Sequence, residues 1–160
     1  MSDDGTLLVA GHIDNERAVV WAKTGGIWNM QVLPTPAGYG ARLEGGMNRH
    51  GDVAGQIFHQ DCPDFSTPAA WFRAGGAWEL VEITERRACH SSGPTGFATD
   101  VSDTREVVGA LILSGQRAFL WRSGRLQLQS AGSAAWAINE SGQFAGSGIE
   151  HRHVMLWTLE

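Results

Sequence analysis

Residues 117–146 of this 160-residue chain, RAFLWRSGRLQLQSAGSAAWAINESGQFAG, carry landmarks that recur elsewhere in the same order. A short apolar run that closes on glycine occurs four times, at Gly11, Gly55, Gly109 and Gly146. A second apolar run follows each of them and ends in tryptophan, at Trp21, Trp71, Trp121 and Trp157. An internal period outranks local propensity as a guide to fold, because each repeat is one supersecondary unit. The chain is therefore predicted to contain four copies of one unit.

Within each unit, apolar runs separated by glycine or polar turns are typical of short antiparallel strands. Strands are expected at residues 5–12, 17–22, 27–33, 42–48, 52–58, 69–73, 78–84, 97–102 and 153–159, besides those of the unit just quoted. Residues 34–41 are expected to form a Pro and Gly loop, and residues 59–68 a long insertion. A count of about 14 strands predicts four units of about four strands each, with one strand missing at each end. Residues 1–160 are expected to form a single all-β domain.

The unit at 117–146 resembles a known repeat family. The match runs through Ala118, Phe119, Leu120, Trp121, Gly124, Ala135, Ile138, Asn139, Gly142, Gln143 and Gly146, which are similar to the HAF repeat of bacterial proteins. This resemblance implies a β-propeller. The other units depart from the pattern: Ser102 stands where asparagine is expected, and only His153 supplies the leading histidine. The resemblance therefore indicates fold far more than function, because one fold hosts many functions.

The composition fits an all-β repeat domain and excludes some partners. There are 21 glycines and seven tryptophans, and 18% of the residues are charged, which suits many short strands and tight turns. The formal net charge is −5, so nucleic acid, which requires a basic stripe, is not an expected partner. The start, MSDDGTLLVAGHIDN, has neither a basic segment nor an apolar stretch long enough for a secretion signal or a membrane span. A cytoplasmic protein with no membrane partner is predicted.

Two cysteines, Cys62 and Cys89, lie in the two longest connections, near His59 and His90. Zinc could be bound by such thiolate and imidazole donors, and two close thiols could instead be oxidised together. The spacing matches no structural zinc signature, and unpaired thiols in polar loops are the favoured interpretation. No metal and no other cofactor is expected.

Turn lengths indicate which face would bind. Alternate turns of an antiparallel sheet lie on opposite faces. The turns NRHG, SDTR and NESG are short, whereas the longer segments gather on the other side, the long-loop face. By repeat symmetry Arg17, Thr67, Arg117 and His153, four residues before each tryptophan, would ring that face and could hold an anion. Simple pairing of the arginines with acids such as Asp14 or Glu16 is the alternative.

Further candidate ligand residues are His12, the inner-strand Trp136, and Arg42, Glu44 and Asp100, which would line a central channel. The favoured function is a binding module for a small molecule or a protein partner. The alternative is an enzyme with lyase or cyclase chemistry, in which His153, His151, His59 and Asp61 would act as acid and base. Because unpaired strand edges at both ends would need cover, a homodimer that completes a larger ring is also predicted.

Overall fold

The computed structural model describes residues 6–14, 16–86, 88–89, 93–148 and 153–158. It contains 14 strands: β1 (Leu7–Ile13), β2 (Arg17–Thr24), β3 (Ile27–Val32), β4 (Tyr39–Arg42), β5 (Val53–His59), β6 (Ser66–Ala74), β7 (Ala77–Glu82), β8 (Thr95–Val101), β9 (Val107–Ile112), β10 (Gln116–Arg122), β11 (Arg125–Leu128), β12 (Ala134–Ile138), β13 (Gln143–Ser147) and β14 (Val154–Thr158). The predicted all-β class and strand count are confirmed. Among the described residues, no helix is long and apolar enough to cross a membrane.

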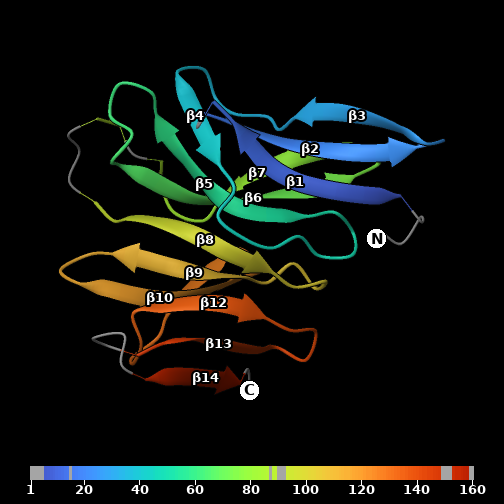
Figure 1. Ribbon diagram of the computed structural model, residues 1–160. Coiled ribbons are helices and arrows are strands. Elements are labelled where there is room, and N and C mark those ends of the chain that lie inside the picture. The colour runs from blue at the N-terminus through green and yellow to red at the C-terminus, as the bar shows by residue number, and fades with distance from the viewer. Residues whose placement is uncertain (1–5, 15, 87, 90–92, 149–152, 159–160) are drawn as a thin grey trace.

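The strands form four antiparallel sheets that follow the chain: sheet 1 (β1–β3), sheet 2 (β4–β7), sheet 3 (β8–β11) and sheet 4 (β12–β14). In each sheet consecutive strands are neighbours, so every connection is a hairpin. The described parts of sheets 1 and 4 have three strands each, as the repeat count predicts. The sheets stack in chain order, and sheets 1 and 4 lie at opposite ends of the molecule (Figure 1).

Three apolar cores hold the stack together, one between each pair of successive sheets. Strand alternation places one set of side chains toward the preceding sheet and the next set toward the following sheet. Val53 and Trp71 of sheet 2 pack toward sheet 1, whereas Ala70 and Phe72 pack toward sheet 3. We call the side of a sheet that faces the preceding sheet its leading face, and the side that faces the following sheet its trailing face.

The recurring glycines allow the first strand of sheets 2, 3 and 4 to lie close to the second. A Cβ built on Gly109 would come within 2.8 Å of the Ala98 Cα, and one built on Gly146 within 2.8 Å of the Ala135 Cα. No side chain fits against backbone at that distance, so glycine is required here for close approach and not for a special φ angle. At Gly11 the nearest atom to such a Cβ is Trp21 Cζ3, at 3.3 Å.

The recurring asparagine shapes the turn between the first and second strands. Asn48 Oδ1 accepts hydrogen bonds from the backbone N–H groups of His50 and Asp52, and Asn139 Oδ1 does the same for Ser141 and Gln143. These are side-chain mimics of a backbone turn. Ser102, at the equivalent position, makes the second of these two hydrogen bonds, because its Oγ accepts from the Glu106 N–H at 3.1 Å. The INxxGQ part of the repeat is thus explained by turn geometry.

Two of the expected boundaries are wrong. The first strand of sheet 2 is Tyr39–Arg42 and not residues 42–48, because Tyr39 to Arg42 pair with His59 to Gln56. Part of the expected Pro and Gly loop is therefore strand. The expected insertion at 59–68 shortens to residues 60–65, since β6 begins at Ser66, whose backbone N–H donates to Thr95 Oγ1 of sheet 3 at 2.9 Å.

Candidate functional site

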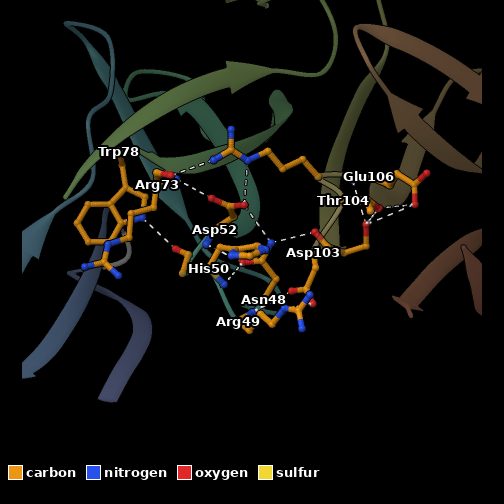
Figure 2. A network of polar contacts seen from close by, with 12 residues as sticks. Asn48, Arg49, His50, Asp52, Arg73, Trp78, Asp103, Thr104 and Glu106 are labelled. Carbon is orange, nitrogen blue, oxygen red and sulfur yellow. Dashed lines mark hydrogen bonds and ion pairs between the residues drawn. The ribbon is translucent and has the colours of Figure 1, made fainter. Parts of the chain in front are cut away.

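The short turns between first and second strands carry a continuous polar network, on what we call the short-turn face (Figure 2). At its centre the fully buried Asp52 accepts hydrogen bonds from Asn48 Nδ2 at 3.0 Å, from the Arg73 backbone N–H at 2.6 Å and from Arg105 Nε at 3.2 Å. A buried carboxylate is tolerated only when it is paired and hydrogen-bonded in this way. Because Arg105 belongs to the next turn, the contact joins sheets 2 and 3.

Arg105 has a φ angle of 62°, in the left-handed region that glycine prefers. The equivalent residues of the neighbouring turns are Gly51, with φ 85°, and Gly142, with φ 72°. The side chain explains the exception, because it bonds Asp52, donates to the Arg73 carbonyl at 2.9 Å and lies 5.1 Å from the Phe72 ring.

Three repeat-equivalent residues extend the network across the turns. Arg49, Asp103 and Glu140 each follow the residue that shapes their turn, Asn48, Ser102 and Asn139. Arg49 Nε lies 2.7 Å from Asp103 Oδ2, and Arg49 Nη2 lies 3.7 Å from Glu140 Oε2. One cation and two carboxyl groups therefore lie in a row across the turns of sheets 2, 3 and 4.

The two carboxyl groups of this series are unequal. A hydrogen bond with Asp103 raises the pKa of Glu140, with burial and the Asp103 charge adding to the effect. Burial opposes ionisation of Asp103, but the hydrogen bonds with Glu140 and the Arg49 backbone, together with the Arg49 charge, lower its pKa. Of the two, Asp103 therefore ionises at the lower pH and the exposed Glu140 at the higher pH.

A hollow of about 420 Å³ opens beside this pair, between sheets 3 and 4. Hydroxyl and charged side chains contribute most of its lining, which consists of Thr104, Glu106, Arg122, Ser123, Glu140, Ser141 and Gly142. The Glu106 carboxylate is already satisfied, since it accepts from Thr104 Oγ1 at 3.1 Å and lies 3.1 Å from Arg122 Nε. Glu140 is the more exposed acid, with 63% of its side chain accessible. Glu140, which lies 3.7 Å from Arg49 Nη2 and hydrogen-bonds with Asp103, is thus the carboxyl group of the hollow that is most open to a ligand, and hydroxyl groups surround it.

Loop length directed the sequence-based prediction to the opposite face. There, Arg17 pairs with Asp14 in its own hairpin, the alternative considered above, and Arg117 Nη1 donates to the Gln129 carbonyl at 3.4 Å. Thr67 is buried, whereas His12 and His153 are exposed. The four positions of the predicted ring belong to four different repeat units. Both arginines are bonded to residues of their own unit, Arg17 to Asp14 and Arg117 to Gln129. His151 lies outside the described residues.

The predicted channel residues have structural partners. Arg42 lies 4.4 Å from the Phe58 ring, and Glu44 accepts from Gln56 Nε2 at 2.7 Å. Asp100 joins sheets 3 and 4 by accepting from the Ile138 N–H at 2.9 Å, and burial raises its pKa. Trp136 occupies a β-bulge, is half exposed, and stacks on Phe97 at 6.2 Å.

The prediction of unpaired thiols is wrong, because Cys62 and Cys89 form a disulfide. It ties the β5–β6 connection to the β7–β8 connection, and His59 Nδ1 lies 3.3 Å from Cys89 Sγ. His59, Cys62 and Cys89 also have their donor atoms within 4.8 Å of one another, close enough for a metal ion if the thiols were reduced. His59 Nδ1 already accepts the Asp61 N–H and lies 3.7 Å from Asp61 Oδ2, so two of the predicted acid–base residues do meet. Disulfides persist mainly in oxidising compartments, and the cytoplasmic location remains a prediction.

No protein-family description, curated protein or solved structure matches this chain.

Proposed function

We propose that this chain is a non-enzymatic binding module, built of HAF-like β-propeller blades, that holds a small polar cation in the hollow at Glu140. Sheet order and strand count support the blade assignment. The observation that carries the binding site is the Glu140 carboxylate at a hollow lined by the hydroxyl groups of Thr104, Ser123 and Ser141. Charge-assisted hydrogen bonds from an ammonium or guanidinium group suit such a lining.

Arg122 shapes the specificity of this site. Its guanidinium lies 3.1 Å from Glu106 Oε1, which leaves Glu140 as the acid toward which a cationic group is drawn. A ligand with hydroxyl groups beside its cationic group would bond both the Glu140 carboxylate and the hydroxyl side chains of the lining. A dianion would meet two carboxylates and only one arginine, and is excluded by charge repulsion.

The first prediction tests this site by calorimetric titration with a primary amine, a guanidine, a neutral alcohol and a carboxylate of matched size. Only the cations should bind, and Glu140→Gln should weaken them about tenfold, the effect of one charge-assisted hydrogen bond. Affinity should rise with pH through the raised pKa of Glu140, because the carboxylate is the binding form. Glu79→Gln, at an exposed position of strand β7, serves as the control. Equal loss in both variants, or preferential binding of the carboxylate, would overturn the assignment.

The neighbouring carboxyl groups of Asp103 and Glu140 favour a second candidate, acid–base catalysis on a small molecule. Two carboxyl groups with pKa values moved in opposite directions can supply an acid and a base. A catalyst would give a bell-shaped pH–rate profile that Glu140→Gln abolishes while ligand affinity survives. A binding module would instead lose affinity.

A further inference from the structure

On each face of a sheet, the exposed fraction of one repeat position shows whether a neighbouring sheet packs against that face. The residue two before the recurring glycine lies on the leading face. It is fully buried at Val53 and Val107, and Phe144 is 2% exposed, yet Val9 of sheet 1 is 47% exposed. Trp21 shares that face, because it pairs with Val9 across β1 and β2. The leading face of sheet 1 therefore presents core residues with no sheet packed over them among the described residues.

The trailing face of sheet 4, at the C-terminal end of the stack, is exposed in the same way. The residue one before the recurring tryptophan is Val20, Ala70 or Leu120 in sheets 1 to 3, and at most 1% of each is exposed. In sheet 4 the equivalent Leu156 is 66% exposed, and Val154, equivalent to the fully buried Ala18 and Ala118, is 86% exposed. Apolar side chains gathered at this exposure mark a protein contact surface.

The exposed apolar surface on the leading face of sheet 1 also extends over β3. Met30 pairs with Trp21, Val32 pairs with Val19, and Trp28 pairs with Lys23, so all three β3 side chains share the leading face. Their exposed fractions are 44% to 49%. In sheet 2 the equivalents of Trp28 and Met30, which are Trp78 and Leu80, pack against the core that sheets 1 and 2 share.

We propose that the trailing face of sheet 4 packs against the leading face of sheet 1 of a second copy, and that two such contacts close a ring of eight sheets. The chain makes this contact type internally, at each of the three cores, by placing leading-face residues on trailing-face residues. In the part of the chain that the structure describes, one uncovered face of each kind is left. Sheets 1 and 4 lie at opposite ends of one chain, so the two faces of a single copy do not meet (Figure 1).

A second copy satisfies both faces at once. The contact is head-to-tail, with different surfaces on its two sides, and such contacts form a closed ring only when the rotation between copies permits it. A two-chain ring contains the contact twice and leaves neither face uncovered. The proposal uses none of the residues of the hollow at Glu140 and stands or falls separately from the binding function.

The test uses two exposed substitutions that leave the three internal cores intact, Val9→Asp on the leading face and Leu156→Asp on the trailing face. Light scattering after size exclusion should give the mass of two chains for the wild type, against 17.2 kDa for one. Each variant alone should be monomeric with an unchanged far-ultraviolet circular dichroism spectrum. Mixed together they should form a heterodimer, because one partner retains a leading face and the other a trailing face.

Leu113→Asp, in the exposed β9–β10 connection, is the control and should remain dimeric. A wild type that stays monomeric at about 100 μM, in the range where weak contacts are populated, would overturn the proposal. A Leu156→Asp variant that stays dimeric would show a symmetric contact through the leading faces instead, and would overturn it as well. A mass above two chains would overturn the closed two-chain ring.

Discussion

At the scale of single residues, Arg105 combines an unfavourable backbone with a favourable side chain. Its left-handed φ angle costs about 1 kcal/mol relative to glycine, while its guanidinium lies beside the buried Asp52. Removing one partner of a buried pair costs about 3 to 5 kcal/mol, although the 46% exposure of the Arg105 side chain reduces that value. We predict that Arg105→Gly lowers the free energy of unfolding by about 1 kcal/mol in urea titration. Arg105→Lys should stay closer to wild type, and a more stable Arg105→Gly would show that backbone strain dominates.

Residue chemistry also explains which site residues the sequence could reveal. Arg49, Asp103 and Glu140 follow equivalent turn-shaping residues, so aligning the units was sufficient to place their charges in one row. Loop length pointed instead to the long-loop face, where Arg17 is taken up by Asp14. Joint oxidation of Cys62 and Cys89 was one alternative that the sequence left open. The sequence could not decide it, because the bond depends on how packing brings together two cysteines 27 residues apart.

At the scale of strands and sheets, the repeat glycines provide an internal comparison. Gly109 lies against the backbone of β8, whereas the described part of sheet 1 begins with β1, and the nearest neighbour of Gly11 is the Trp21 side chain. We predict that Gly109→Ala destabilises the protein by about 1 to 3 kcal/mol, as overpacking does. Gly11→Ala should change stability by less than about 0.5 kcal/mol, since the neighbouring side chain can move. Equal effects in urea unfolding would mean that the two positions need glycine for conformation and not for space.

Most strands were predictable because a two-residue period and glycine turns recur in every unit. The exception is β4, which the sequence placed at residues 42–48. Pro34, Pro36, Gly38 and Gly40 suggested a loop there, yet the backbone of β4 pairs with β5, and the Ala41 N–H donates to the Glu16 carbonyl of the preceding sheet at 2.7 Å. Tertiary pairing overrode local propensity at this strand.

At the scale of the whole molecule, the repeat predicted four sheets but could not predict ring closure. Closure depends on the rotation between sheets, which unequal connections and side-chain packing determine. A stack in which each sheet contacts only its neighbours behaves as a nearly one-dimensional array, and its terminal units are the least stable. Within the described residues, sheets 2 and 3 are covered on both faces, and sheets 1 and 4 on one.

Amide hydrogen exchange can test this difference between the terminal and the central sheets. In the monomeric Leu156→Asp variant, exchange should be fastest in β1–β3 and β12–β14, since local opening there disrupts one core, whereas opening of β5, β6, β9 or β10 disrupts two. In the proposed wild-type dimer the terminal sheets should gain protection and the central sheets should change little. Mass spectrometry of exchanged peptides measures both states. If the terminal sheets of the monomeric variant were as protected as the central ones, each chain would be stable without neighbours on its outer faces, and the head-to-tail contact would have nothing to stabilise.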